Sequence, residues 1–474
     1  MKQKLILLVF LIGANWIHAQ VFDTEKIKDS GDNDKRLNLV ILSEGYQASE
    51  FDKFKTDAES IVNAMFSQSP FLEYSNYFNV HIVKVPSNES GADHPGTAVD
   101  VTEPHNIPVS SADTYFNATY DTFGYHRFLY YGIDYNDAIE ADLKINAVLA
   151  ANFPTYDQAL IVVNSAEYGG TGGEFPIVSN GPEANELAIH ELGHSMFNLK
   201  DEYLLSDELF YGEAINMTQE NNISLVKWKN WINTNGVNVY QHGTTGVPAT
   251  WYRPHQNCKM RYLGVPFCSV CKEGMVEKIH DLISPVESFS PNNKTVNNPS
   301  FPVDFVLNLI KPQPNTLTNT WTLNGNYIND NVDAISIVAS DLEIGENVLI
   351  AVIEDDSNLV DVDNHNLSSH IYTVQWTINY STLGIENIKG KTNEYRISLY
   401  PIPAKHVLNV KIESANYQKL SIKITSMDGK VVSSIPINNP TGTQIDISHL
   451  STGIYVANFY SGTSLISSER LVKN

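Results

Sequence analysis

The chain has 474 residues, of which 54 are acidic and 31 are basic, so its formal net charge is −23. A surface with this charge repels the phosphates of nucleic acids and the headgroups of anionic membranes, so we expect neither as a partner. The length predicts about three domains, each large enough to bury a core.

The N-terminus has the pattern of a signal peptide. A basic start and a short apolar run over residues 5–13 precede a small residue, Ala19. This pattern predicts that residues 1–19 are removed on export. The run is too short to span a bilayer, and no later segment is long and apolar enough to do so. The residue directly after the expected cleavage point is not a cysteine, which disfavours a lipoprotein.

The first part of the mature chain predicts a mixed α/β region. Residues 37–43 are a continuous apolar run of the kind that forms a buried strand. A helix is expected over residues 49–68, because apolar residues recur there at helical spacing. Residues 77–85 and 156–164 predict two further strands, whereas residues 86–125 have the composition of long loops.

The stretch that follows contains the clearest catalytic pattern. His190 and His194 belong to a His-Glu-x-x-His sequence, so on a helix their side chains lie on one face, a turn apart. Two imidazoles at this spacing can bind one zinc ion, with Glu191 beside a bound water as general base. Gly181-Pro182 favours a helix start just before them. A surface helix with two solvated histidines is the alternative.

A zinc peptidase also needs a third protein ligand. Asn198 can adopt the left-handed conformation with which helices end, and Asp201 follows three residues later. We expect this turn to return Asp201 to the metal as the third ligand. Glu202 is the first alternative, and the more distant Glu208 or Glu213 is the second.

All three cysteines lie between residues 258 and 271. In an oxidising compartment they predict one disulfide and one free thiol, with three possible pairings. His255 lies three residues before Cys258. A structural zinc site made of His255, Cys258, Cys268 and Cys271 is therefore a second interpretation.

From about residue 285 the pattern changes to short alternating strands. It predicts an immunoglobulin-like β-sandwich over residues 285–380, with Trp321 and Trp376 in its core. Residues 381–395 are expected to form a linker, and residues 396–474 a second all-β sandwich. The strands of the first sandwich are expected over residues 301–309, 319–324, 333–339, 347–354 and 371–379.

The catalytic pattern and its surroundings carry a family resemblance. His190-Glu-Leu-Gly-His194, followed by Leu199-x-Asp201-Glu202-Tyr203, resembles the zinc metalloendopeptidases typified by the bacterial IgA peptidase, a metzincin-related family. The likeness covers about residues 37–280 and includes Tyr168-Gly-Gly170 and Cys258-Lys-Met260. This chain differs from the pattern that we expect of the family at one position, because it has Asn198 where we expect the family to have glycine.

This resemblance implies a zincin- or metzincin-like α/β catalytic domain over residues 20–284. It also implies a methionine turn below the zinc, for which Met260 is the candidate. Tyr262 then has the spacing of a catalytic tyrosine that reaches the metal or an oxyanion. Residues 156–164, with the glycines that follow, are expected to bind the substrate as an added strand.

The C-terminal region carries a second resemblance. Tyr400-Pro-Ile-Pro403, Met427-Asp-Gly429 and Leu450-Ser-Thr-Gly453 are similar to motifs of the C-terminal sorting domain of the type IX secretion system in Bacteroidetes. The resemblance implies that the type IX secretion machinery is a partner. It also implies that the protein is extracellular or on the outer cell surface.

Together the patterns predict a secreted, multidomain zinc endopeptidase that hydrolyses peptide bonds of extracellular proteins or glycoproteins. Zn²⁺ would activate a water molecule, and Glu191 would act as the general base. Two other classes stay open. One is a catalytically inactive peptidase-fold adhesin, and the other is a zinc amidase acting on glycan or cell-wall amides.

Overall fold

The computed structural model describes residues 20–101, 108–205, 211–363, 365, 370–381, 395–414, 419–439 and 442–474. The expected signal peptide, Glu208 and most of the expected linker lie outside these residues. The chain forms two compact units, one of Met1–Leu342 with Asn347–Ile378 and one of Glu343–Glu346 with Asn379–Asn474. The domain boundaries expected from the sequence stay predictions.

The first unit opens with a six-stranded sheet in the order β1-β3-β2-β6-β8-β7. Its four inner strands are parallel, and the two edge strands β1 and β7 run antiparallel to their neighbours. The short strand β7 therefore lies at an edge beside β8. The strands are β1 (Asp23–Lys28), β2 (Leu37–Glu44), β3 (Phe78–Lys84), β6 (Gln158–Val163), β7 (Gly170–Thr171) and β8 (Ile177–Ser179).

Helices cover both faces of this sheet, as the two sides of β2 make clear. Leu39 and Ile41 pack in one core cluster with residues of α1 (Phe51–Met65) and α3 (Ala184–Ser195). Val40 and Leu42 point to the other face and pack with α2 (Tyr135–Asn152). Every residue of β2 is buried, so the strand expected over residues 37–43 is confirmed.

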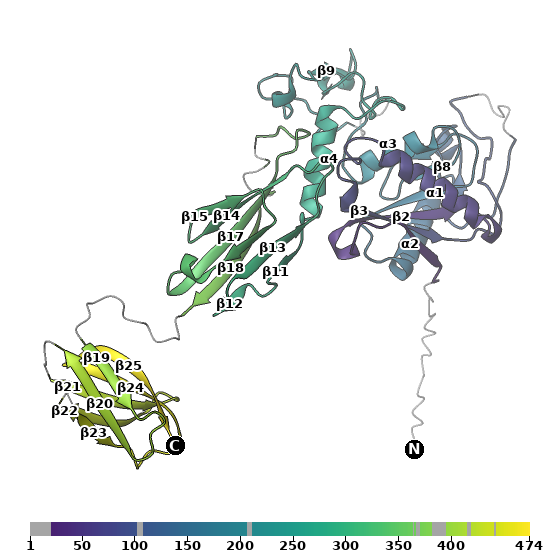
Figure 1. Cartoon of the computed structure of the whole chain (residues 1–474). Helices are drawn as coiled ribbons and strands as arrows, with labels where there is room; N and C mark the ends of the chain where they lie inside the picture. The colour runs from purple at the N-terminus through teal and green to yellow at the C-terminus, as the bar shows by residue number, and fades with distance from the viewer. Residues whose placement is uncertain are drawn as a thin grey trace, which may run out of the picture. The chain divides into compact units, whose positions relative to one another are not determined.

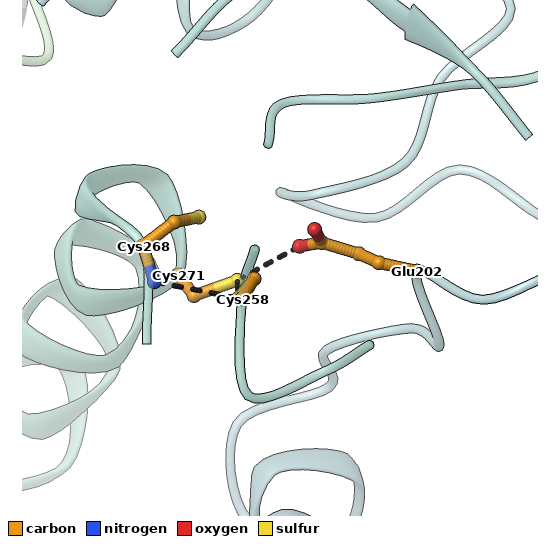
Figure 2. A group of neighbouring side chains, drawn as sticks. All are labelled: Glu202, Cys258, Cys268 and Cys271. Carbon is orange, nitrogen blue, oxygen red and sulfur yellow. Dashed lines mark hydrogen bonds between the residues drawn. The ribbon is translucent and has the colours of Figure 1, made fainter. Parts of the chain in front are cut away.

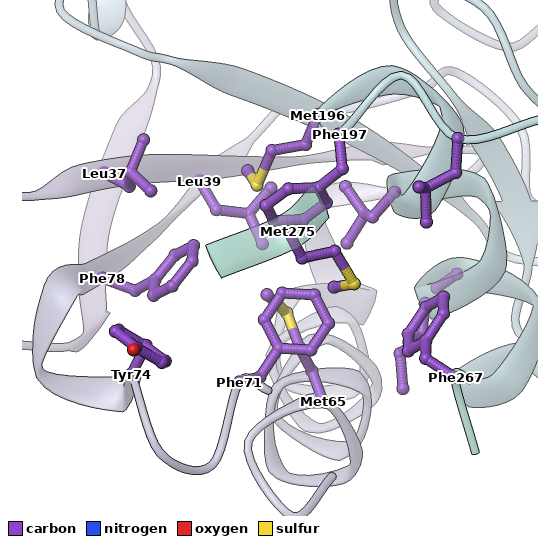
Figure 3. Close-up of a cluster of buried hydrophobic side chains, with 14 of the residues drawn as sticks. Leu37, Leu39, Met65, Phe71, Tyr74, Phe78, Met196, Phe197, Phe267 and Met275 are labelled. Carbon is purple, nitrogen blue, oxygen red and sulfur yellow. The ribbon is translucent and has the colours of Figure 1, made fainter. Parts of the chain in front are cut away.

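The larger of these two clusters fills the space between α1, α3 and α4 (Ser269–Leu282). Figure 3 shows Phe71 and Met65 on one side of it, with Phe197 and Met275 reaching in from the segments that follow the catalytic pattern. Burial of each such side chain contributes about 2 kcal/mol. The cluster therefore ties α3 firmly to the sheet.

Two helices were missed by the sequence analysis. The sequence does contain an N-cap residue for α2. The Asp134 side chain accepts hydrogen bonds from the backbone amides of Asn136 and Asp137 at the start of the helix. The helix α4 begins inside the cysteine-rich stretch, where Val270, Cys271 and Met275 are buried at helical spacing.

Two further sheets follow α4 within the first unit, in the orders β11-β13-β16 and β12-β18-β17-β14-β15 (Figure 1). Their side chains share one core, in which Trp321 and Trp376 are fully buried and stack with ring centroids 5.8 Å apart. Both tryptophans thus occupy the core as expected. The immunoglobulin-like assignment stays a prediction. The strands are β11 (Val286–Ser290), β12 (Thr295–Asn297), β13 (Val303–Leu309), β14 (Leu317–Leu323), β15 (Asn326–Asp330), β16 (Ala334–Ile337), β17 (Gly345–Asp355) and β18 (Tyr372–Tyr380).

The second unit is entirely β, with sheets in the orders β19-β20-β23 and β22-β21-β24-β25. Leu408, Ile422 and Phe459 belong to its separate core. The strands are β19 (Tyr395–Tyr400), β20 (Val407–Ser414), β21 (Leu420–Ser426), β22 (Val431–Ile437), β23 (Thr443–Asp446), β24 (Gly453–Ser461) and β25 (Ser464–Lys473).

The structure as a whole is mostly β-sheet, divided among several separate sheets. Two-stranded sheets complete the first unit: β4 (Ala118–Thr119) with β5 (Tyr130–Tyr131), and β9 (Tyr240–Gln241) with β10 (Tyr252–Arg253). In the part of the chain that the structure describes, no helix combines the length and apolar character needed to cross a bilayer.

Candidate metal centre

The helix α3 carries the catalytic pattern and ends as its sequence predicts. Asn198 has a φ of 56°, in the left-handed region. Its backbone amide donates to the His194 carbonyl at 2.9 Å, and the Leu199 amide donates to the Gly193 carbonyl at 3.0 Å. These two bonds close the helix and reverse the chain, so the residues after Leu199 return towards the histidines.

The reversal brings three ligand atoms together. His190 Nε2 and His194 Nε2 are 3.2 Å apart. Asp201 Oδ1 lies 3.2 Å from the first nitrogen and 3.1 Å from the second. We call His190, His194 and Asp201 the histidine site.

Hydrogen bonds set the orientation of both imidazoles. His190 Nδ1 donates to the Lys259 carbonyl at 3.0 Å, and His194 Nδ1 donates to the Leu199 carbonyl at 2.8 Å. A carbonyl oxygen only accepts, so each Nδ1 carries a proton and each Nε2 can present a lone pair. Three electron-rich atoms therefore face one another at close range, an arrangement that a shared cation stabilises.

The donor set fits zinc. Ligand atoms at about 2.0–2.1 Å from a tetrahedral zinc ion are about 3.3 Å from one another. The three separations of 3.1–3.2 Å are close to this value. Two imidazoles and one carboxylate also leave a coordination position open, as catalytic zinc sites do.

The charges within the site act strongly on one another. Burial alone would lower the pKa of His194, but the charge of Asp201 and a hydrogen bond to it raise that pKa to about 9. Burial opposes ionisation of Asp201, yet the two histidines hold the pKa of its carboxyl well below its usual range. Asp201 is therefore a permanent anion beside the two rings.

Glu191 lies between the histidine site and the edge of the sheet. Its carboxylate is within 4.8 Å of the ligand nitrogens of both histidines. Burial raises the pKa of Glu191, although the neighbouring histidines oppose this effect. A Cβ atom on Gly172 would lie 2.9 Å from Glu191 Oε2, so glycine leaves room for the carboxylate just after β7.

The sheet order corrects one expectation. Residues 156–164 form β6, which lies between β2 and β8, so both of its edges are already paired. A substrate strand cannot be added to β6. Among the described strands, β7 pairs with β8 alone and lies next to Gly172. It is therefore the edge that could accept an extended chain.

Met260 and Tyr262 are placed differently with respect to the site. Met260 is fully buried, and a Cβ on Gly193 would lie 2.9 Å from its sulfur, so the methionine packs directly below α3. Tyr262 is 49% exposed, and its ring packs beside the Arg261 guanidinium. Burial and the nearby Asp201 carboxylate instead raise the pKa of the Tyr203 hydroxyl, which places that hydroxyl close to the site. Tyr203 belongs to the motif of the family resemblance, in which it lies two residues after Asp201, but no role was predicted for it.

Glu202 points away from the histidine site, although it is the neighbour of Asp201. Its side chain is fully buried, and its Oε1 accepts hydrogen bonds from Asn216 Nδ2 at 3.1 Å and Cys271 Sγ at 3.3 Å. Burial, followed by the nearby Cys258, raises the pKa of the Glu202 carboxyl well above its ordinary value. Glu213 is engaged elsewhere, with Thr218 and Lys227.

The cysteines also differ from expectation. The disulfide expected from the sequence is absent, because Cys258, Cys268 and Cys271 are all free and buried in the described chain. His255 is not their neighbour in a metal-ligand group, since its ring bonds Asn235 and Asn257. Glu202 takes the place that the second interpretation gave to His255 (Figure 2).

Two other groups of potential ligands occur in the first unit. His94, His126 and Glu167 form one, and Glu277, His365 and His370 form the other. In the first group His126 contacts Glu167 and His94 contacts Asp121, and in the second both histidines contact Glu277. Neither group lies on α3.

Comparison with known proteins gives two family matches. Residues 26–239 match the family described as IgA Peptidase M64, and residues 398–474 match the secretion system C-terminal sorting domain. No curated protein matches the chain.

Solved structures share only parts of the chain. Latent PorU from Porphyromonas gingivalis is 10% identical, with 40% of this chain and 20% of that chain covered and a TM-score of 0.15. A β-glucuronidase from Faecalibacterium prausnitzii is 14% identical, with 33% and 32% covered and a TM-score of 0.15. The chain thus spans a third or less of these two proteins, and neither likeness supports an argument about fold.

The family matches cover the two regions in which the sequence motifs occur. The histidine site lies within residues 26–239, and the motifs from Tyr400 onwards lie within residues 398–474. The chain therefore combines a region that matches the IgA peptidase M64 family with a type IX sorting domain, which directs it to the extracellular or cell-surface space.

Proposed function

We propose that the protein is a zinc-dependent endopeptidase that cleaves extracellular proteins or glycoproteins. The observation that carries the proposal is the triangle formed by His190 Nε2, His194 Nε2 and Asp201 Oδ1, with sides of 3.1–3.2 Å. Zinc matches this triangle in ligand type and spacing. The presence of the M64 domain supports peptide bonds as the target.

His190, His194 and Asp201 would hold the zinc ion. When bound, zinc supplies a Lewis acid that polarises a carbonyl group and lowers the pKa of water. Glu191 accepts a proton from the attacking water at its carboxylate and then donates it to the nitrogen of the leaving amine. Its burial, which raises the pKa of its carboxyl, makes Glu191 a stronger base and favours the first of these two proton transfers.

The free edge of β7 favours an extended polypeptide as substrate. Backbone amides and carbonyls of such a chain can pair with the unpaired edge of β7 and continue the sheet. Gly170 and Gly172 have no side chains that would obstruct this approach. Pairing through the backbone places a peptide group, rather than a side chain, beside Glu191.

The Glu191→Gln variant tests the proposal. It removes the proton acceptor but no zinc ligand, so we expect turnover of a protein such as casein to fall by about 1,000-fold or more. Zinc bound to the histidine site should stay unchanged by elemental analysis. Glu140→Gln, on the exposed side of α2, is the matched control and should retain full activity.

Substantial cleavage by Glu191→Gln would contradict the proposed general base. A wild-type protein that binds zinc but cleaves no protein substrate would contradict the peptidase function itself. Sequencing of the new termini released from a proteome digest would then define the cleavage specificity of an active enzyme.

A further inference from the structure

A second cluster of metal-binding side chains lies beneath the histidine site, and we call it the cysteine cluster. Glu202 comes from the loop after α3, Cys258 from the turn before Met260, and Cys268 and Cys271 from the start of α4. Figure 2 shows Glu202 reaching from its loop towards the three cysteines. All four side chains are buried, with Cys268 the most exposed at 6%.

The separations within the cysteine cluster suit a tetrahedral metal ion. Cys258 Sγ and Cys271 Sγ are 3.6 Å apart, and Cys271 Sγ is 3.3 Å from Glu202 Oε1. With zinc–sulfur bonds of about 2.3 Å and zinc–oxygen bonds of about 2.1 Å, these distances would be about 3.8 and 3.6 Å. The four ligand atoms all lie within 4.8 Å of one another.

One carboxylate oxygen of the cysteine cluster lacks a hydrogen-bond partner. Glu202 Oε2 is buried and has no hydrogen-bond partner among the described residues, whereas Oε1 accepts from Asn216 and Cys271. A fully buried carboxylate oxygen without a partner is unusual, and a bound cation would satisfy it. The charge of Glu202 acts on the guanidinium of Arg253, which raises the pKa of that guanidinium against the effect of burial.

The start of α4 also presents backbone groups that stabilise negative charge. Cys268 is the N-cap residue of α4 and Cys271 lies in its first turn, where the backbone amides and the helix dipole stabilise negative charge. The Cys268 amide donates to Cys258 Sγ at 3.3 Å. Amide donors of this kind support thiolate ligands of a metal.

We propose that Glu202, Cys258, Cys268 and Cys271 bind a structural zinc ion. Four anionic ligands around Zn²⁺ leave a net charge of about −2, the same as in a Cys₄ zinc site. The site would be closed, because all four coordination positions come from the protein. Sulfur-rich tetrahedral sets select zinc over magnesium or calcium.

This ion would join three segments that the histidine site depends on. Glu202 adjoins the ligand Asp201, and its amide donates to the Met260 carbonyl at 2.7 Å. Cys258 adjoins Lys259, whose carbonyl orients His190. The proposed ion therefore positions the histidine site from below, and its binding does not depend on catalytic activity.

Zinc counting on the full chain tests the proposal. We expect about two zinc ions per wild-type chain and about one in the double variant His190→Ala/His194→Ala. Adding Cys271→Ser to the double variant should remove the remaining ion. Glu202→Gln in the same background should lose zinc to a chelator at least about 10-fold faster, whereas Glu213→Gln, an acidic residue outside the cluster, should not.

Cysteine variants could lose zinc because they misfold. Two measurements therefore use chains that retain all three cysteines. X-ray absorption at the zinc edge of His190→Ala/His194→Ala should detect sulfur at about 2.3 Å. Thiol titration of denatured wild-type protein in chelator should find three reactive thiols.

One reactive thiol and no zinc in the double variant would mean that a disulfide replaces the ion and would overturn the proposal. Iron or copper in place of zinc would overturn the identity of the metal. Loss of protein cleavage with one zinc ion retained in the double variant would support the proposal, because only the histidine site would then have lost its ion.

Discussion

The histidine site and the cysteine cluster begin at adjacent residues but have opposite environments. Asp201 is 18% exposed and faces two imidazoles beside the edge strand β7. Glu202 is fully buried among sulfur atoms. Side chains alternate along an extended backbone, so two neighbouring carboxylates can serve two centres. A catalytic centre must leave a position open to water and substrate, whereas a structural centre is closed by protein ligands.

The largest effect expected from this comparison is that substitution of Asp201 mainly lowers turnover, whereas substitution of Glu202 mainly lowers stability. Asp201→Ala removes a proposed zinc ligand of the histidine site, so we expect turnover to fall at least about 100-fold. Glu202→Ala opens a gap in the buried cluster, so we expect the free energy of unfolding to fall by about 3 kcal/mol. Cleavage assays and urea unfolding of both variants measure the contrast. Equal destabilisation by the two substitutions would break the comparison.

Met260 connects the two regions and should matter for stability. It is fully buried below Gly193, and its carbonyl accepts from the Glu202 amide. Met260→Ala leaves a cavity, so we expect the free energy of unfolding to fall by about 3 kcal/mol. Met427→Ala, at a position that is 72% exposed, is the control and should change it by less than about 0.5 kcal/mol. If Met260→Ala leaves the free energy of unfolding unchanged, the residues around Met260 repack to fill the cavity.

A smaller effect distinguishes two tyrosines near the histidine site. The Tyr203 hydroxyl lies near Asp201, whose charge contributes to raising the pKa of that hydroxyl. Tyr203→Phe removes the hydroxyl, so we expect kcat/KM to fall about 10-fold. The sequence-based prediction instead assigns the catalytic tyrosine to Tyr262, which packs beside Arg261. The two phenylalanine variants, assayed together, decide between them. A larger loss in Tyr262→Phe would favour the sequence-based prediction.

The smallest effect concerns the far end of α4, whose first turn carries two of the cysteines. Burial opposes ionisation of Glu277, but hydrogen bonds from His365 and His370 lower its pKa to about 2. A carboxyl with a lowered folded pKa contributes stability above its unfolded pKa, here 4.5, and that stability is lost as the pH falls towards 2.

Urea unfolding at several pH values measures this contribution. Between pH 4.5 and about 2.5, wild-type protein should lose at most about 2 kcal/mol more than Glu277→Gln. Glu140→Gln, on the exposed side of α2, should follow the wild-type curve. If Glu277→Gln also follows it, the histidine contacts do not stabilise α4.

Much of the histidine site could be predicted because its parts are close in sequence. The spacing of His190 and His194 places them on one helical face, and Asn198 adopts the left-handed turn that returns the chain. The buried strand β2 was equally clear from its apolar run. Each of these predictions depends on a period or a turn within a few residues.

The contacts of the cysteines and of Glu202 depend instead on residues far apart in sequence. Lys259 orients His190 across 69 positions, and Cys271 contacts Glu202 across the same separation. Position in the sequence placed His255 nearest to the cysteines, whereas folding placed Glu202 there. The same limit applies to the edge strand, since only the complete sheet order reveals that β7 and not β6 is open.

The sequence by itself determined the helix of the catalytic pattern, the turn after it, the acidic character of the chain and the two family resemblances. These properties depend on local periodicity, backbone preference and composition. The tertiary structure decided which carboxylate faces the histidines, which groups surround the cysteines and which strand has a free edge. Each of those outcomes arises from packing between segments whose separation no local pattern encodes.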